Sequence, residues 1–346
     1  MSAFPSVMPT PRISEPLDAP VLRWGVLGPG WIAALFAAAV QAHTGQKIVA
    51  VGSRSMDRAA AYARRFGIDR AYGSYAELVA DPGIDVVYVA SPHSEHRDQA
   101  LLAIAAGKHI LVEKAFTRNA KEAQEVIEAA RSAGVLAQEA MWTRFLPHMD
   151  VVRQLLEDGT LGDISTLLAD HGQCFHAPAE DRLFNPQLAG GALLDLGIYP
   201  LSFASFVPGA PVRVTAVGQK AFTGVDGQVS AVLTADSGAQ AIINTTLFAK
   251  TPTTAAIAGS HARIEIATEF YMPNVVKLIS RSGELRVWDD NKILRHDGLC
   301  FAASEVARLV AQGASSSPLL SLAESLSIMG TSDEIRRQIG VSYPGE

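Results

Sequence analysis

The stretch Val21-Leu-Arg-Trp-Gly-Val-Leu27 runs directly into Gly28-Pro-Gly-Trp-Ile-Ala33, and this junction decides the fold. Its first half is a short apolar run that predicts a buried parallel strand, and the alanine-rich segment after it predicts a helix. The pattern between them, G-x-G-x-x-A, is typical of a dinucleotide-binding turn rather than of an ordinary glycine turn. We therefore assign four residues of this turn to a cofactor site: Gly28, Gly30, Trp31 and Ile32.

Apolar strands and helical segments continue to alternate up to about residue 140. Strands are predicted at residues 47–51, 86–90, 109–112 and 135–140, and helices at 31–42, 57–66, 95–106 and 120–133. Ser55 is a plausible N-cap for the second helix. Strands that alternate with helices of this length indicate βαβ units. The sequence thus predicts an α/β fold whose N-terminal domain, residues 21–143, is a Rossmann doubly wound parallel sheet.

The pattern changes after Pro147. Strands with weak alternation are predicted at residues 164–175, 212–220, 228–234, 240–247, 262–267, 275–280 and 284–288, joined by tight turns such as Asp226-Gly227. Helices are predicted at residues 149–156, 193–206, 303–312 and 320–339. We expect a second domain, residues 144–346, of α+β type with a large, mostly antiparallel open sheet. Residues 1–20 contain five prolines and are expected to form a flexible arm.

Composition excludes several classes of protein. The chain has 346 residues, 48% of them hydrophobic and 18% charged, with a net charge of −6. A general nucleic-acid or anionic-membrane binder needs clustered Lys and Arg, so neither partner is expected. We find no apolar run that reaches the roughly 20 residues of a membrane helix. Cys174 and Cys300 are too few for a disulfide scaffold, and with no export signal apparent they favour the cytoplasm.

The end of the second strand favours one cofactor over another. NAD sites usually place Asp or Glu there to bind the ribose 2′-hydroxyl, whereas this chain has Gly52-Ser53-Arg54. Arg54 and Ser53 are suited to a 2′-phosphate, and Arg58 lies one helical turn farther on. NADP(H) is therefore expected in preference to NAD(H). A solvated surface arginine is the alternative interpretation.

Two further segments fall at the carboxyl edge of the predicted parallel sheet, where ligands bind. The first contains Ser91, Pro92, His93 and His96, and the second ends in Glu113-Lys114. The two histidines have the spacing of metal ligands, but no third ligand follows, so we expect a structural or cofactor-contacting role and no metal. Lys114 alone is equally compatible with an ordinary surface lysine.

A family resemblance makes these positions more specific. The chain resembles the family of glucose-fructose oxidoreductase, inositol dehydrogenase and rhizopine-catabolism proteins, the Gfo/Idh/MocA family, from about residue 21 onward. It is most similar to the branch with dimeric dihydrodiol dehydrogenase and NADP-dependent xylose dehydrogenase. The motifs that carry the resemblance are the glycine turn, residues 91–96, Glu113-Lys114, Glu139-Ala-Met-Trp-Thr-Arg-Phe145, Gly190-Gly-Ala-Leu-Leu-Asp-Leu-Gly-Ile-Tyr-Pro200, Ser317-Pro318, Glu324-Ser325 and Asp333-Glu-Ile-Arg336.

The resemblance implies catalytic roles for Lys114, Asp195 and Tyr199. The family's Glu-Lys-Pro motif falls on Glu113-Lys114, but Ala115 replaces the proline, which puts the backbone geometry after the lysine in doubt. Asp195 and Tyr199 are four residues apart, so in a helix they share one face. A nearby ammonium favours the phenolate form of a tyrosine, and Tyr199 would then exchange the hydroxyl proton while Asp195 holds the polyol or orients Lys114.

Other residues are expected near the substrate or cofactor. Trp142 and Arg144 follow the last predicted strand of the nucleotide domain, and either would line the cleft that binds cofactor and substrate. Arg182, Phe184 and Asn185 fall in a loop whose apolar and polar side chains suit a sugar or cyclic diol. Asp170, His171, Cys174 and His176 share one predicted strand, but we expect no metal there.

The sequence therefore predicts an NADP(H)-dependent oxidoreductase. Its substrate would be a sugar, a cyclic polyol or a trans-dihydrodiol, oxidised at a CH–OH carbon or reduced at the matching carbonyl. Two alternatives stay open: a sugar transhydrogenase with a tightly bound cofactor, and a catalytically silent NADP-sensing regulator. A homodimer or homotetramer is expected through the open face of the second sheet, because such a face otherwise invites association.

Overall fold

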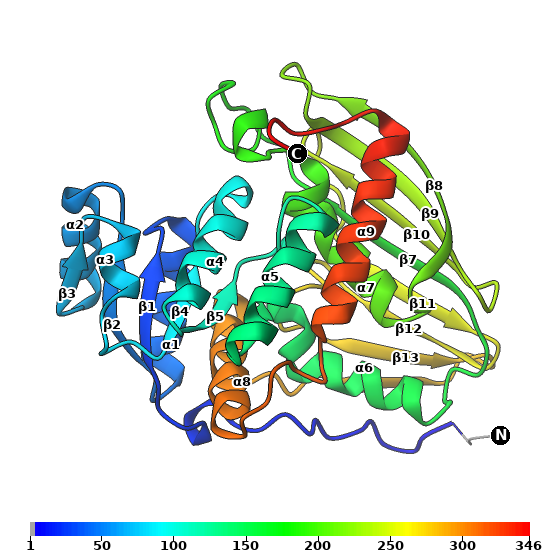
Figure 1. Cartoon of the computed structure of the whole chain (residues 1–346). Helices are drawn as coiled ribbons and strands as arrows, with labels where there is room; N and C mark the ends of the chain where they lie inside the picture. Colours follow the sequence, from blue (N-terminus) through cyan, green and yellow to red (C-terminus); the bar gives the residue numbers. More distant parts are fainter. Residues whose placement is uncertain (1–3) are drawn as a thin grey trace. The chain divides into compact units, whose positions relative to one another are not determined.

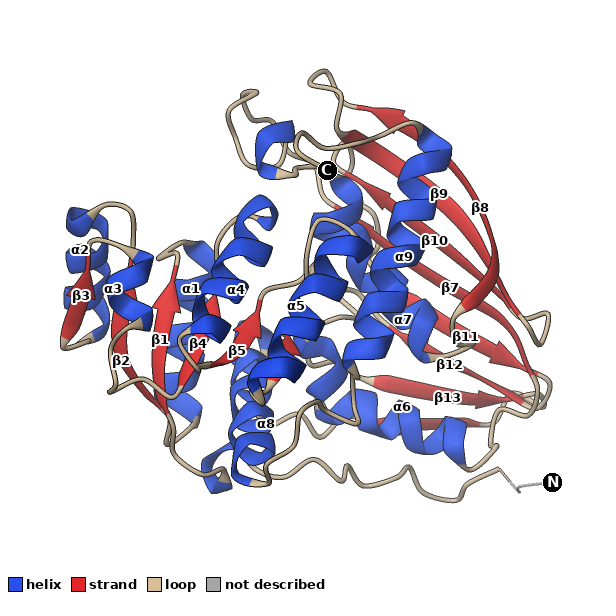
Figure 2. Ribbon diagram, viewed as in Figure 1, coloured by secondary structure: helices blue, strands red, loops and turns tan. Residues whose placement is uncertain are grey.

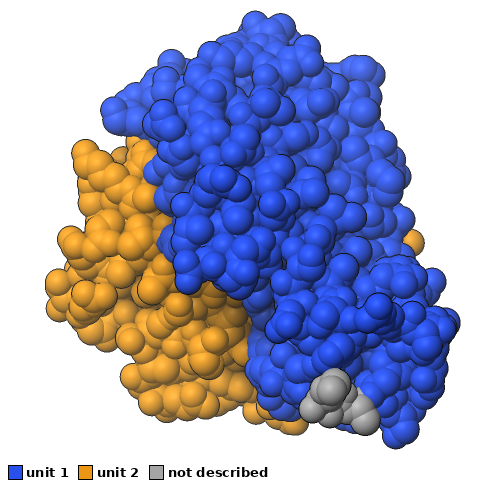
Figure 3. Space-filling view, turned by 90° about the vertical axis from the view of Figure 1, so that its right-hand side faces the viewer, with its two compact units in different colours: residues 1–13, 146–294, 327–346 blue, residues 14–145, 295–326 orange. Residues whose placement is uncertain are grey.

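The computed structural model describes residues 4–346, which form two compact units. Unit 1 holds residues up to 13 together with 146–294 and 327–346, and unit 2 holds residues 14–145 and 295–326; Figure 3 colours them blue and orange. The change of unit at 145/146 lies close to the expected domain boundary at 143/144. Residues 295–326 were expected in the second domain, but they group with unit 2 because helix α8 (Leu299–Ala311) packs against α1 (Trp31–His43).

Unit 2 is built on a six-stranded sheet in the order β3-β2-β1-β4-β5-β6, with every neighbouring pair parallel. The strands are β1 (Arg23–Leu27), β2 (Lys47–Gly52), β3 (Arg70–Tyr72), β4 (Val86–Val89), β5 (His109–Val112) and β6 (Ala137–Glu139). This order confirms the predicted doubly wound fold. The order reverses between β1 and β4, and in such sheets ligands bind beyond the carboxyl ends of the strands at that point.

In unit 2, the helices from α1 to α5 connect successive strands of the sheet, whereas α8 comes from a later part of the chain (Figure 1). Besides α1 and α8 they are α2 (Met56–Phe66), α3 (Tyr75–Val79), α4 (His96–Ala105) and α5 (Ala120–Ala133), with short turns η1 (Pro16–Asp18), η2 (His93–Glu95), η3 (Trp142–Phe145) and η6 (Arg295–Gly298). Ser55 caps α2 as predicted, because its hydroxyl accepts a hydrogen bond from the backbone N–H of Arg58. The short elements β3 and α3 were not predicted.

Unit 1 is built on an eight-stranded sheet in the order β14-β13-β12-β11-β7-β10-β9-β8. The strands are β7 (Ile164–Gly172), β8 (Pro211–Lys220), β9 (Asp226–Ala235), β10 (Gln240–Thr246), β11 (Ala255–Gly259), β12 (Ala262–Ile266), β13 (Val276–Ser280) and β14 (Leu285–Trp288). Only β7 and β10 pair in parallel, so the mostly antiparallel sheet is confirmed. β11 was not predicted, because Ala255-Ala-Ile-Ala258 is rich in alanine, which is uncommon in strands.

Helices lie over one face of this sheet in Figure 2. The helical elements of unit 1 are α6 (Pro147–Glu157), the short turn η4 (Pro186–Leu188), the π-helical turn η5 (Leu193–Gly197), α7 (Ile198–Phe206) and residues 327–339 of α9 (Leu322–Ile339). The opposite face carries exposed apolar side chains, among them Leu168, Val217 and Ile242.

One helical stretch corrects the expectation about membrane-length runs. Pro186–Phe206 spans 21 residues at a mean hydropathy of 1.2, long and apolar enough by composition alone to cross a membrane. In the fold, however, 89% of that window is buried, so its apolar character serves the core of unit 1.

The N-terminal arm makes defined contacts over the part that the structure describes. Arg12 binds Asp150 on α6 through its guanidinium at 2.9 Å and its backbone N–H at 2.7 Å, and it also pairs with Glu157. Farther along, the carbonyls of Ser14 and Glu15 accept hydrogen bonds from Arg308 on α8. The arm was expected to be flexible, but these charged contacts hold it against its own chain.

Candidate active site

The glycine turn has the geometry that its sequence predicted. Gly28 has φ +85°, and a Cβ there would lie 3.0 Å from the carbonyl oxygen of Ala90 at the end of β4. Gly30 is the N-cap of α1, where no side chain caps the helix, and a Cβ there would have the carbonyl oxygen of Gly28, 4.0 Å away, as its nearest neighbour. The first N–H groups of α1 therefore face outward with a positive dipole, which suits a pyrophosphate. Trp31, the first helical residue, is 67% exposed.

The end of β2 presents positive charge. Ser53 is buried, and its hydroxyl accepts a hydrogen bond from the backbone N–H of Ser55. Arg54 and Arg58 are both exposed, and neither side chain takes part in an ion pair with any described residue. Both guanidinium groups are therefore available to an anion at this strand end.

His96 connects the two segments at the carboxyl edge of the sheet. Its Nε2 lies 2.9 Å from the carbonyl oxygen of Ser91, and its Nδ1 lies 2.9 Å from the carbonyl oxygen of Ala115. Burial lowers the pKa of His96, although the two carbonyls oppose that shift, so the neutral ring donates to one of them at a time. His96 thus fixes the backbone after Lys114, while His93 is buried beside it with its ring 5.5 Å away.

Glu113 and Lys114 follow β5. The Glu113 carboxylate accepts a hydrogen bond from the hydroxyl of Tyr88, whose buried ring stacks on Phe36. Lys114 is partly exposed, and its backbone N–H donates to the same carboxylate at 3.3 Å. The Lys114–Ala115 peptide bond is cis.

Glu139 at the end of β6 is a buried carboxyl next to the same backbone. It accepts a hydrogen bond from the hydroxyl of Ser325 at 2.6 Å and one from the N–H of Phe116. Burial raises the pKa of Glu139 to about 7, against the lowering effect of these bonds and of Arg144. Arg144 is 3% exposed and pairs with Glu324 at 2.5 Å. The motif residues around 139–144 and 324–325 therefore meet in the interior of unit 2.

Aromatic rings gather beside the start of α1. His296 in η6 lies edge-on to the exposed ring of Trp31, with centroids 5.4 Å apart, and stacks on Trp142 at 6.0 Å. Trp142 is 2% exposed, so most of its surface packs inside unit 2. His296 was not singled out from the sequence, because it lies more than 150 residues from Trp142.

In unit 1 the π-helical turn η5 presents Asp195. Its carboxylate accepts a hydrogen bond from Arg182 at 2.8 Å; the Arg182 side chain is 50% exposed and that of Asp195 is 9% exposed. Tyr199 follows in the first turn of α7 and is 8% exposed. π-Helical turns within helices are rare and are frequent at functional sites. The structure therefore brings Arg182 and Asp195 together, as the sequence did not predict.

Two further aromatic residues surround Tyr199. Tyr271 stacks on it with centroids 4.4 Å apart, and His171 on β7 stacks on Tyr271 at 4.6 Å. Burial raises the pKa of Tyr271, and the charges of Glu269 and Asp195 add to that effect, so Tyr271 stays neutral. Tyr271 was missed because it lies in a loop with no motif, and His171 was considered only as a metal ligand.

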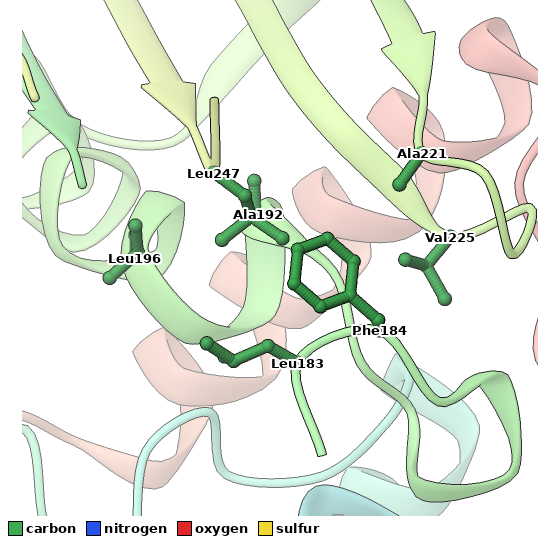
Figure 4. Packing of buried hydrophobic residues seen from close by; sticks show 7 residues of the cluster. All are labelled: Leu183, Phe184, Ala192, Leu196, Ala221, Val225 and Leu247. Atoms are coloured by element: carbon green, nitrogen blue, oxygen red, sulfur yellow. The ribbon is translucent and has the colours of Figure 1, made fainter. Parts of the chain in front are cut away.

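Phe184 lies in a buried cluster rather than on an open surface. Figure 4 shows this cluster, whose members are Leu183, Phe184, Ala192, Leu196, Ala221, Val225 and Leu247. Phe184 is 3% exposed, and its ring lies 5.3 Å from that of Phe222. Its packing anchors the loop that carries Arg182, and Asn185 caps the short turn η4 by accepting from the N–H of Gln187.

Asp170, His171, Cys174 and His176 do not all lie on one strand, contrary to the sequence-based prediction. β7 ends at Gly172, so Cys174 and His176 lie beyond it, with their side chains 3.7 Å apart. Asp170 instead accepts hydrogen bonds from the N–H groups of Thr253 and Thr254. Among residues 4–346, no group of three or more His, Cys, Asp or Glu side chains is placed to hold a metal ion.

Comparison with known proteins places this chain in a family. Residues 22–141 match the model described as "Oxidoreductase family, NAD-binding Rossmann fold", and residues 149–265 match the GFO/IDH/MocA C-terminal domain. The chain belongs to the Gfo/Idh/MocA family. The resemblance predicted from its motifs is thereby confirmed.

Characterised relatives of this Gfo/Idh/MocA protein include trans-1,2-dihydrobenzene-1,2-diol dehydrogenases. The pig enzyme is 34% identical over 332 residues, covering 93% of this chain and 98% of the relative, and the human enzyme is 33% identical over 331 residues with the same coverage. Among solved structures, a 3-ketoreductase from Actinomadura kijaniata in complex with NADP and TDP-benzene is 28% identical with a TM-score of 0.80. The match covers 92% of this chain and 98% of the 3-ketoreductase chain.

This Gfo/Idh/MocA protein is therefore an NAD(P)-dependent oxidoreductase with a nicotinamide-nucleotide-binding Rossmann domain. The residues present fit that cofactor. Gly28 allows the tight turn, Gly30 leaves room for a phosphate, and the uncapped N-terminus of α1 supplies donors for it.

Proposed function

We propose that this protein is an NADP(H)-dependent oxidoreductase acting on the CH–OH carbon of a sugar, cyclic polyol or trans-dihydrodiol, or on the matching carbonyl. Tyr199 is the general acid/base, Lys114 assists it, and Asp195 binds or orients the substrate hydroxyls. The observation that carries the proposal is the helical segment with Asp195 and Tyr199, to which a separate loop adds Arg182 through its ion pair with Asp195. Together they offer a proton carrier and hydrogen-bonding groups within unit 1.

Cofactor preference rests on the end of β2. Arg54 and Arg58 are exposed and unpaired within the described chain, and Ser53 keeps a hydroxyl proton to donate. A 2′-phosphate placed there gains charge-assisted hydrogen bonds that a 2′-hydroxyl lacks. The 3-ketoreductase of Actinomadura kijaniata, which was solved in complex with NADP, has a similar fold.

The chemistry divides between hydride and proton. The bound nicotinamide supplies or accepts the hydride. In oxidation, the Tyr199 oxygen takes the hydroxyl proton as the hydride leaves the same carbon; in reduction, it returns that proton to the carbonyl oxygen. Lys114 contributes a positive charge that favours the phenolate during oxidation, and its backbone is fixed by Glu113 and His96.

The residues around Tyr199 support the proposed substrate class. Tyr271 and His171 add a stacked aromatic surface, and the Arg182–Asp195 pair adds charged hydrogen-bonding groups. An apolar surface next to a few polar groups suits a ring with vicinal hydroxyls. The relatives named as dihydrobenzenediol dehydrogenases support a cyclic diol.

The decisive experiment is a substrate panel. Aldoses, inositols, anhydro-sugars and trans-dihydrodiols are screened for reduction of NADP, and the matching carbonyls for oxidation of NADPH. We expect multiple turnovers with free cofactor and at least one of these compounds. If each protein molecule turns over only when a second sugar is added, the enzyme is a transhydrogenase. Tight NADP binding without turnover on any compound would indicate a regulator and overturn the proposal.

We also propose that a second copy of the chain covers the open face of the eight-stranded sheet, giving a homodimer or homotetramer. Leu168 and Ile242 are neighbours in the sheet register and are 49% and 43% exposed, and the partly buried Val232 and Ala256 flank them in the same row. Four adjacent apolar residues across the centre of a sheet favour burial against another surface.

Light scattering with size-exclusion chromatography tests this proposal. We expect a dimer or tetramer for the wild type and a shift towards monomer for Leu168→Asp combined with Ile242→Asp. Val7→Asp removes an exposed apolar residue of the arm and is the control, with no effect expected on mass. A monomeric wild type at micromolar concentration would contradict the assignment.

A further inference from the structure

The side chain of Asp226 contacts the first residue of the helical segment that carries Asp195 and Tyr199. It is the first residue of β9, and its side chain is fully buried. One carboxylate oxygen, Oδ2, accepts a hydrogen bond from the backbone N–H of Leu193 at 2.6 Å, and Leu193 is the first residue of η5. The first N–H groups of a helix have no partners inside it, and a carboxylate there is favoured by the helix dipole. Asp226 thus caps the segment from a distant strand.

The glycine pair before this segment is explained by the same contact. Gly191 has φ +123°, and a Cβ at this position would lie 2.2 Å from Oδ1 of Asp226. A Cβ on Gly190 would lie 2.6 Å from the carbonyl oxygens of Arg182 and Leu183. Both glycines are therefore required for close packing. They bring the helix start against Asp226 on one side and against the backbone of Arg182 on the other.

The groups that face Asp226 are charged or titratable, yet the proposed chemistry uses none of them. Arg336 on α9 is the nearby cation, and it pairs with Asp333 at 2.7 Å and with Glu346 at 2.8 Å. Tyr343 lies over the Arg336 guanidinium, 4.8 Å from ring centroid to carbon, and it is buried beside Asp226. Burial raises the pKa of Asp226 to about 7, while the Leu193 N–H and Arg336 oppose that rise.

We propose that Asp226 is a positioning residue for the reaction, acting through the Leu193 N–H to hold Asp195 and Tyr199 in their working orientation. This inference rests on the proposed function, which gives those two residues their roles. Catalytic groups need their geometry fixed to within about 0.5 Å, and a misplacement of about 1 Å costs on the order of 100-fold in rate. A shift of the helix start would also disturb the Arg182–Asp195 pair, because Gly190 packs against the Arg182 backbone.

Substitutions separate this role from simple stability. Asp226→Asn keeps the volume and one accepting oxygen but removes the charge, and we expect kcat to fall about tenfold with no change in the dissociation constant of NADP. Gly191→Ala displaces the same carboxylate from the other side and should give a similar loss. Asp236→Asn, at an exposed position in the turn after β9, is the matched control: it makes the same change of carboxylate to amide away from the Leu193 contact, so kcat should stay within twofold of the wild type.

Hydrogen exchange supplies a readout that does not depend on turnover. In Asp226→Asn, the amides of residues 192–199 should exchange at least fivefold faster than in the wild type, while those of β10 stay unchanged. Equal exchange in the two proteins, or a loss of kcat that follows uniformly faster exchange throughout unit 1, would overturn the inference. If the wild type shows no turnover on any substrate, the proposed function fails, and the exchange comparison still decides whether Asp226 holds this segment.

Discussion

Lys114 and Tyr199 are held in place by the same kind of group but in different frameworks. In unit 2, the backbone after Lys114 is bound by Glu139, which lies at the end of the neighbouring strand β6. In unit 1, the segment with Tyr199 is bound by Asp226, which lies on β9 and is separated from that segment along the chain by β8. Both carboxyls are buried, and burial raises the pKa of each to about 7.

The difference lies in how each carboxyl reaches its partner. Parallel strands of a doubly wound sheet deliver their ends to one edge, so Glu139 and Lys114 become neighbours by topology alone. The antiparallel sheet has no such common edge, and Asp226 reaches Leu193 only because Gly190 and Gly191 allow a close approach. The first arrangement follows from the fold, whereas the second depends on individual residues.

The largest expected effect comes from removing the proton carrier. Tyr199→Phe keeps the ring but not the hydroxyl, so kcat should fall by about 10²–10⁴, the usual range for general acid–base catalysis, with little change in cofactor affinity. Lys114→Met should reduce kcat at least as far, because it removes a charge and a donor. Steady-state kinetics on a good substrate measure both.

Lys121→Met, at an exposed position in the first turn of α5, is the control for Lys114 and should leave kcat unchanged. Near-normal turnover of Tyr199→Phe would mean that Asp195 or a water carries the proton. The roles proposed for the two units would then have to be reassigned.

The next effect concerns the pH dependence of stability. Glu139 binds its proton more tightly in the folded chain than in the unfolded chain, so the free energy of unfolding falls as pH rises from about 4.5 to about 7. Between pH 5 and 8 this carboxyl alone should account for a loss of about 2–3 kcal/mol. Glu139→Gln still accepts from Ser325 and should remove that part of the slope.

Chemical denaturation at several pH values measures this slope, and Asp226→Asn should flatten it by a comparable amount. Glu128→Gln, at an exposed position on α5, is the control and should leave the slope as in the wild type. A slope unchanged by Glu139→Gln would show that the carboxyl is already ionised in the folded chain near pH 5.

The sequence was sufficient for most of the fold. Strand ends were predicted within a few residues along the whole chain, because the alternation of apolar strands with helices is strong and turns such as Asp226-Gly227 are explicit. The failures have physical causes. β3 has three residues, which is too few for a periodic signal, and β11 consists mainly of alanine and glycine. α8 joins unit 2 through packing against α1, which no local pattern records.

The candidate site was predictable only where a motif or the sheet edge marks it. Gly28 and Lys114 stand next to strand ends, and Asp195 and Tyr199 share one motif. Partners that come from elsewhere in the chain were missed, among them Tyr271 beside Tyr199 and Asp226 beneath Leu193. Such contacts are set by the packing of whole elements, and a single sequence holds no signal for them.

A smaller effect tests whether unit 2 alone selects the cofactor. Arg54 is proposed to bind the 2′-phosphate, so NADP should bind more tightly than NAD by about 1.5–3 kcal/mol, the range for hydrogen bonds to charged groups. Arg54→Ala should remove most of that difference. Fluorescence titration of both cofactors measures it.

Arg64→Ala, in the last turn of α2, removes an exposed arginine of the same helix and should leave the preference intact. Equal dissociation constants for NADP and NAD in the wild type would rule out the proposed preference. Tyr199→Phe should not alter either constant, because its hydroxyl acts on the substrate.

The smallest expected effect is on the stability of unit 1 and leaves its catalytic activity unchanged. Arg12 joins the arm to α6 through Asp150, but the Arg12 side chain is 53% exposed, so solvent screens the pair. Arg153 also binds Asp150 at 2.9 Å, so Arg12→Ala does not leave that buried carboxylate without a cation. The free energy of unfolding should therefore fall by only about 0.5–1 kcal/mol, and less at high salt, while kcat stays unchanged. Denaturant titrations at low and high salt measure the loss, and a large fall in kcat would instead tie the arm to catalysis.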